Sequence, residues 1–190
     1  MHKFLYCLKC DKEQDFEVRQ EKESYPVRGE QTEIIAQVTY CKQCGEQIWN
    51  EDLDEVNLKE AYRKYRSNHD LLQPEEIKRI RDKYALSQTS FGKLLGFGDK
   101  TITRYENGSI QDMAQNNLIV LAEYPDVFEL LLQRNKEHLS PQDFERAISK
   151  IMEYKPHVIC GDNPISYRTD YENYQYGLGN RYFGGLLNVG

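Results

Sequence analysis

Four of the five cysteines in this chain stand in two CxxC pairs, Cys7 with Cys10 and Cys41 with Cys44. Each CxxC turn places two thiolates on one side of a tight knuckle, and two knuckles supply the four sulfurs of a tetrahedral, closed metal site. The alternatives are two disulfides or a redox dithiol, but a redox CxxC is normally a single pair that opens a helix in a βαβ unit. The spacing therefore predicts one structural zinc ion bound by these four cysteines.

A second group of residues could contact nucleic acid. The stretch DKTITRYEN has helical spacing, which puts Ile102 and Tyr105 on one face and polar side chains on the other. A helix fits the DNA major groove, where Arg or Lys can bond a guanine edge and a threonine methyl can pack on a thymine methyl. The alternative is that these charges only solvate an exposed face. The predicted DNA-binding residues are Gln88, Lys100, Thr101, Thr103 and Arg104.

No arrangement of residues typical of an enzyme accompanies these two groups. The sequence has no GxSxG, no HExxH and no glycine loop ending in GK[ST]. Cys160 and His157 each stand alone, which argues against a second metal site. We therefore expect no catalytic residues and no enzymatic function.

The polar face must be held by a scaffold, and the segment 74–108 has the sequence signals of a helix-turn-helix. Pro74 followed by two glutamates favours a helix start, and Ser87 is a plausible N-cap for a second, short helix. The letters GFGD then predict a tight turn into the third helix, which Gly108 would close at its C′ position. The apolar residues that we expect on the buried side are Ile77, Ile80, Tyr84, Phe91, Leu94 and Leu95. Two short helices joined by a glycine turn and flanked by others indicate a helix-turn-helix.

The interval between the two cysteine pairs favours strands, because Pro26 and Gly29 precede a run rich in β-favouring residues. The predicted fold class is α+β: a small β-rich zinc ribbon domain, then an all-α helix-turn-helix domain and a C-terminal helical or irregular tail. The predicted domains are a zinc-binding domain at 1–50, a linker helix at 51–70, a helix-turn-helix domain at 71–134, and an extra helix with a Tyr/Gly-rich tail at 135–190.

The extra helix should start with Ser140 as N-cap and Pro141 in its first turn. Its expected buried face comprises Phe144, Ala147, Ile148 and Ile151. After residue 160 the chain holds six of its 12 glycines and five of its 14 tyrosines without clear periodicity. We expect that tail to be flexible or to become ordered on a partner.

The stretch LSQTSFGKLLGFGDKTITRYENG resembles the XRE-class helix-turn-helix, and its RYENG ending is close to that of the MqsA-type antitoxins. Those proteins place a two-knuckle zinc domain before this motif, and YPVRG at 25–29 matches their layout; the resemblance covers about residues 1–134. It implies a type II antitoxin that represses its own operon as a dimer, through the C-terminal helices, and binds a cognate RNase-like toxin through the zinc domain.

By position, the resemblance assigns Lys100, Thr103 and Arg104 to the DNA-contacting face and the four paired cysteines to the zinc ion. Lys100 replaces an uncharged amide residue, which affects the expected operator sequence and not the docking mode. Similar proteins can continue into a larger toxin-neutralising domain, called Panacea or SocA-like, of which the present tail would be a short remnant or variant.

Charge and hydropathy limit the partners. The net charge of −6 and pI near 5.3 are not typical of a nonspecific nucleic-acid binder, and they suit a basic protein partner. The chain lacks an apolar run of about 18 residues and a secretory signal pattern, so we expect a cytoplasmic protein. The alternative function is a zinc-containing XRE-class regulator of a phage or mobile element that has no toxin partner.

Overall fold

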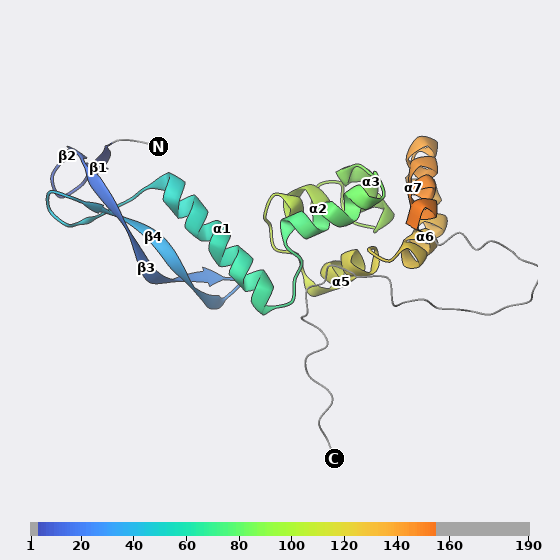
Figure 1. The fold of residues 1–190 in the computed structure, drawn as a ribbon, viewed down its shortest axis with the longest axis horizontal. Helices are drawn as coiled ribbons and strands as arrows, with labels where there is room; N and C mark the ends of the chain where they lie inside the picture. The colour runs from blue at the N-terminus through green and yellow to red at the C-terminus, as the bar shows by residue number, and fades with distance from the viewer. Residues whose placement is uncertain (1–3, 155–190) are drawn as a thin grey trace, which may run out of the picture. The chain divides into compact units, whose positions relative to one another are not determined.

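The computed structural model describes residues 4–154, and its small antiparallel sheets followed by helices confirm the α+β class (Figure 1). The predicted Tyr/Gly-rich tail lies outside the described residues. None of the helices between residues 4 and 154 combines the length and the apolar character needed to cross a membrane.

Two small sheets form the N-terminal part. Strands β1 (Leu5–Cys7) and β2 (Lys12–Gln14) pair antiparallel, and β3 (Phe16–Val27), β4 (Glu30–Cys41) and β5 (Gln47–Ile48) form a second sheet in that order. The β3–β4 hairpin turns at Arg28 and Gly29, whose φ angles of 48° and 84° suit a two-residue turn of type I′. The hairpin therefore spans most of the interval between the two cysteine pairs.

Helix α1 (Glu51–Asn68) packs on this hairpin and is part of the N-terminal core. Its residues Ala61 and Tyr65 are buried against Ile34, Ala36 and Val38 of β4. Asn57 accepts a hydrogen bond from the Gln37 amide (2.9 Å) and donates one to the Gln37 carbonyl (3.0 Å), which fixes the helix on the strand. The segment predicted as a linker thus also covers the sheet.

The remaining helices build a second core. They are α2 (Pro74–Lys83), α3 (Gln88–Leu94), α4 (Thr101–Glu106), α5 (Met113–Leu121), α6 (Pro125–Arg134), the 3-10 turn η1 (Lys136–His138) and α7 (Pro141–Tyr154). The predicted signals are confirmed: Pro74 is the first residue of α2, Ser87 caps α3 by accepting from the Ser90 amide (3.0 Å), and Gly108 follows α4 with φ 102°.

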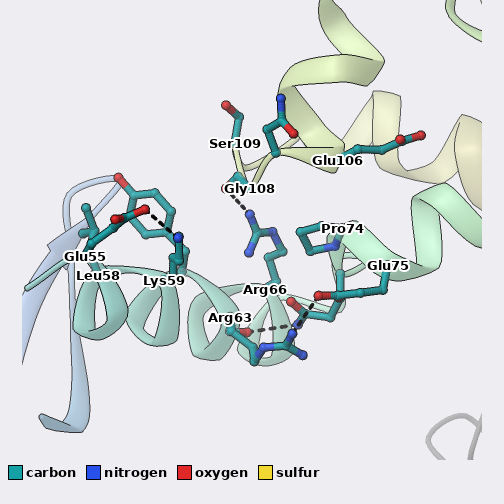
Figure 2. Close-up of a pocket in the computed structure, with 13 residues that line it drawn as sticks. Glu55, Leu58, Lys59, Arg63, Arg66, Pro74, Glu75, Glu106, Gly108 and Ser109 are labelled. Atoms are coloured by element: carbon teal, nitrogen blue, oxygen red, sulfur yellow. Dashed lines mark hydrogen bonds and ion pairs between the residues drawn. The ribbon is translucent and has the colours of Figure 1, made fainter. Parts of the chain in front are cut away.

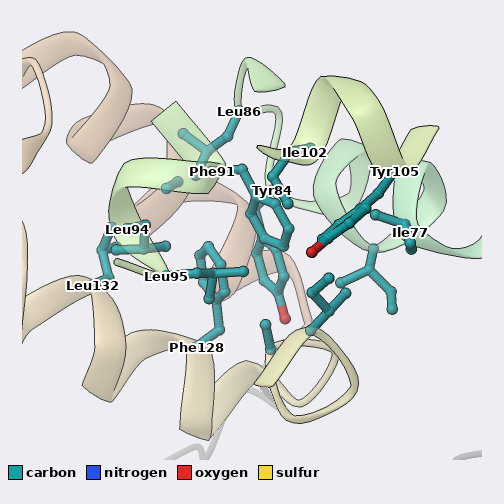
Figure 3. Packing of buried hydrophobic residues seen from close by; sticks show 14 of the residues in the cluster. Ile77, Tyr84, Leu86, Phe91, Leu94, Leu95, Ile102, Tyr105, Phe128 and Leu132 are labelled. Atoms are coloured by element: carbon teal, nitrogen blue, oxygen red, sulfur yellow. The ribbon is translucent and has the colours of Figure 1, made fainter. Parts of the chain in front are cut away.

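All six residues predicted to be buried in the helix-turn-helix belong to this second core (Figure 3). The rings of Tyr84 and Phe128 stack at 3.5 Å between centroids, and the Tyr84 hydroxyl donates to the Glu123 carbonyl (3.0 Å). Helix α7 closes the core with its predicted face, since Ala147 and Ile151 are buried. These contacts hold α3 and α4 in place relative to the other helices of this core.

Candidate metal centre and nucleic-acid interface

The four paired cysteines meet at one point between β1, β4 and the turns that follow them. All four Sγ atoms lie within 4.8 Å of one another, with 3.5 Å between Cys7 and Cys44 and 3.9 Å between Cys10 and Cys41. Four sulfurs placed tetrahedrally at about 2.3 Å from a metal ion would stand about 3.8 Å apart. A disulfide would need about 2.05 Å, and the cysteines are free thiols. The cluster is therefore positioned to bind a metal ion.

The two CxxC knuckles share one backbone conformation. The residue that follows each pair is in the left-handed region, Asp11 with φ 52° and Gly45 with φ 72°. This conformation folds the chain back, so that the Gly45 amide donates to the Cys41 carbonyl (2.9 Å) and the Cys41 amide to the Glu46 carbonyl (2.8 Å). Glycine adopts this conformation without the penalty that Asp11 carries.

Thiols this close cannot all ionise without a cation. Hydrogen bonding with Cys44, together with desolvation, raises the pKa of Cys10 to about 12. Burial acts to raise the pKa of Cys41, but hydrogen bonds from the Cys44 and Gln43 amides outweigh it and lower that pKa to about 7. A divalent ion would favour the thiolate form of all four, because its charge opposes their mutual repulsion.

The predicted DNA-binding residues lie on and beside α4, but they differ in exposure. Lys100 and Arg104 are exposed, and neither side chain has a hydrogen bond or ion pair to another described residue. Thr103 is half-buried. Thr101, predicted on the exposed face, is instead 6% exposed, because the first turn of α4 points it at the Gly98 turn. The exposed part of the predicted face is formed by Lys100 and Arg104.

Gln88 joins α3 to α4 by hydrogen bonds. Its amide accepts from the Thr103 hydroxyl (2.8 Å) and donates to Glu106 (2.6 Å). Glu106 in turn forms a two-pronged ion pair with Arg81 of α2, at 2.6 and 3.0 Å. The bond to Glu106 raises the pKa of Arg81, so this arginine is charged at every ordinary pH. Gln88 and Thr103 are therefore held in place on a rigid support.

The sequence analysis missed the Arg81–Glu106 pair. The side chain of Arg81 is 11% exposed and that of Glu106 is 6% exposed. A buried charge needs a partner of this kind. The available signal was the glutamate of RYENG, which follows Tyr105 at the buried side of α4. Spacing alone could not pair it with a residue 25 positions earlier.

The loop after α4 is also bound by two arginines of the N-terminal part. Arg66 of α1, 2% exposed, donates to the Gly108 carbonyl, and Figure 2 shows this contact at the wall of a pocket between α1 and the loop. Arg28, at the hairpin turn, donates to the carbonyls of Ile110 (2.6 Å) and Gln111 (3.2 Å). Desolvation lowers the pKa of Arg66 from its usual value. The loop after α4 thus contacts both the hairpin and α1.

Comparison with known proteins gives a family match. The family model described as "Antitoxin component of bacterial toxin-antitoxin system, MqsA" matches residues 5–132, which include the four-cysteine cluster and α2 to α5. A search of the curated proteins found no match.

Proposed function

The chain belongs to the MqsA family of antitoxins, and from this premise we propose that it is a type II antitoxin that represses its own operon and binds a cognate RNase toxin. One observation carries the proposal: the family match runs without interruption through both the cysteine cluster and the helix-turn-helix. A plain regulator would need only the second of these. The proposed role requires binding and no catalysis.

The metal that we propose for the cluster is zinc, with Cys7, Cys10, Cys41 and Cys44 as its ligands. Four thiolates in a tetrahedron suit zinc or iron, and a closed site of this kind is structural. The two sheets around the cluster share only a small core of Cys7, Cys41 and Ile48 with a few partly buried neighbours. Metal binding supplies the stability that so small a core lacks.

For DNA binding we propose that α4 enters the major groove of operator DNA, with Arg104 and Lys100 reaching base edges. Thr103 would approach the groove beside them, and Gln88 would act from the start of α3. Two copies of the chain would place two such helices on a palindrome, one helical turn or a multiple apart. The Arg104 side chain is exposed and has no hydrogen bond or ion pair with the part of the chain that the structure describes, which leaves it available to DNA.

The toxin would bind the N-terminal part, defined by the zinc centre, the hairpin and α1. This part has no catalytic arrangement among its described residues and contributes no side chain to the α4 face. Such a module fits the role of a protein-binding surface. A cytoplasmic location follows from the proposed contact with operator DNA.

The test is to co-express the untagged product of the neighbouring reading frame with the tagged full chain. We expect a stable complex, rescue of growth, and specific binding of the pair or the free chain to the chain's own promoter DNA. Promoter binding without a complex or rescue would instead support the regulator without a toxin. Absence of promoter binding at low salt would contradict the autorepressor role.

A further inference from the structure

Large apolar side chains are exposed at the knuckle end of the N-terminal part. Leu8, between the first two cysteines, is 89% exposed, and Trp49, between β5 and α1, is 72% exposed. Tyr6 of β1 is 51% exposed. Single exposed apolar residues are ordinary, but a group that includes a tryptophan marks an interaction site.

These side chains line two adjoining hollows, of about 410 and 310 Å³. Leu8, Ile48 and Trp49 contribute to the walls of both. The two hollows therefore form one groove between the first knuckle, β5 and the first turn of α1, and we call it the knuckle groove.

The charged side chains that line the knuckle groove are all acidic. Glu51 and Asp52 border the larger hollow, and Glu23 and Asp54 border the smaller one. The positive end of the α1 dipole accounts in part for the three residues of its first turn, but not for Glu23, which lies on β3. Burial, and next to it the charge of Glu23, raises the pKa of Asp54. The repulsion between these two carboxylates would be relieved by a cation supplied from outside.

We propose that the knuckle groove is the docking surface for a basic protein partner, which places an apolar side chain between Leu8 and Trp49 and an arginine or lysine against Glu23 and Asp54. The inference rests on the proposed function in taking the toxin to be that partner. Arginine fits best, because its planar guanidinium can stack on an indole and hydrogen-bond a carboxylate at the same time. Tryptophan and arginine are also the residues that most often dominate the energy of protein interfaces.

The chemistry of the groove disfavours other occupants. Nucleic acid would bring phosphates against four carboxylates, and a second copy of this chain carries a net charge of −6. The zinc centre has a clear role here, since it fixes the knuckle that presents Leu8. A groove that is rigid before binding loses little entropy when the partner docks.

Trp49 is the only tryptophan of the chain, so its fluorescence reports directly on the groove. The full-length, zinc-loaded protein is titrated with the tryptophan-free peptide amide acetyl-LRLRL and, in parallel, with acetyl-LELEL. We expect a saturable blue shift with the arginine peptide alone. The double variant Glu23→Gln/Asp54→Asn should weaken binding at least about tenfold, the effect of losing 1.4 kcal/mol of charge attraction, and Leu8→Ser should weaken it similarly.

Ile35→Ala is the matched control, because Ile35 is 62% exposed on the same sheet but does not line the groove. Its titration should equal that of the unchanged protein, and zinc content should be equal in all variants. The proposal is overturned if no saturable shift occurs, if the glutamate peptide binds as well, or if the groove variants bind like the control.

Pull-down of the neighbouring reading frame's product by the same variants separates this inference from the proposed function. If that product binds the unchanged chain and the groove variants equally, the groove is not its docking surface, although the antitoxin role stands. If it does not bind the unchanged chain at all, the antitoxin role fails. The peptide titration then decides whether the groove accepts basic, apolar chains.

Discussion

Arg81 and Arg104 both belong to the helix-turn-helix, but their surroundings give them opposite roles. Arg81 is 9% exposed and paired with Glu106, whereas the Arg104 side chain is exposed and has no hydrogen bond or ion pair with the described residues. A buried paired arginine stabilises the fold, and an exposed unpaired arginine on a recognition helix is available to a ligand. The two roles can be separated by mutation.

Arg104→Ala should weaken operator binding and relax sequence preference. A bidentate contact of arginine with guanine discriminates by about 1–3 kcal/mol per base pair, and a dimer makes the contact twice. Binding is measured by fluorescence anisotropy on operator and scrambled DNA. Lys93→Ala removes an exposed charge from α3 and serves as the control. Unchanged operator affinity of the Arg104 variant would remove α4 from the recognition role.

Glu106→Ala should destabilise the helical core without changing the zinc content. It removes the buried counter-charge of Arg81 and leaves only the exposed Asp82 carboxylate, and breaking a buried pair typically costs about 3–5 kcal/mol. Asp82→Ala removes the other, 53% exposed partner of Arg81 and should cost less than about 1 kcal/mol. Urea unfolding followed by helical circular dichroism distinguishes the two. Equal losses in both variants would show that Glu106 is not the essential partner.

At the scale of elements, the helix-turn-helix could be predicted from sequence more completely than the zinc part. Pro74, Ser87 and Gly108 are local signals for helix ends, and each acts within one turn of its own position. Strand β3 has no such signal: most of its side chains are exposed and many are charged. It is a strand because β4 pairs with it along its whole length, and this pairing is a tertiary effect.

The candidate site, like the fold, could be predicted only where its signals are local in the sequence. Cysteine spacing identified the cluster, because ligand spacing is itself a local pattern. The Gln88–Thr103 bond and the Arg81–Glu106 pair depend on how α2, α3 and α4 cross, and the periodicity of one helix contains no such information. The burial of Thr101 depends in the same way on the turn before α4.

Removal of the metal should unfold one element group and spare the other. Cys41→Ser removes a buried thiolate from the cluster, and the small core around Cys7 and Ile48 then lacks the metal that we propose holds it. We expect one zinc per unchanged chain, none in the variant, and loss of protection of β1, β2 and β5 in hydrogen exchange while α2–α7 remain protected. Cys160→Ser is the control and should keep the zinc. If the unchanged protein keeps the exchange pattern of its zinc-loaded form after the zinc is removed, the metal is not structural.

For the whole molecule, the boundary between the two cores falls between neighbouring residues. Leu71 packs in the core of the hairpin and α1, and Leu72 packs in the core of the helices. The backbone of Leu72 is held by Asn116 (2.9 Å) and Gln111 (2.7 Å). Each side of this boundary therefore has its own buried centre, and only Arg28, Arg66 and a few further contacts join them.

This division predicts that the two proposed activities can be separated by cutting the chain. Residues 1–71 with zinc should neutralise the neighbouring toxin in a growth assay, because they contain the zinc centre, the knuckle groove and α1. Residues 72–190 should bind operator DNA and leave the toxin active, because they retain α2–α7 and the exposed Arg104. The fragment 1–71 carrying Cys41→Ser should not protect.

Protection by the C-terminal fragment alone would place neutralisation beyond residue 71. Protection by neither fragment, with rescue by the full chain, would mean that the contacts of Arg28 and Arg66 with the loop after α4 are needed to hold the toxin-binding surface in shape.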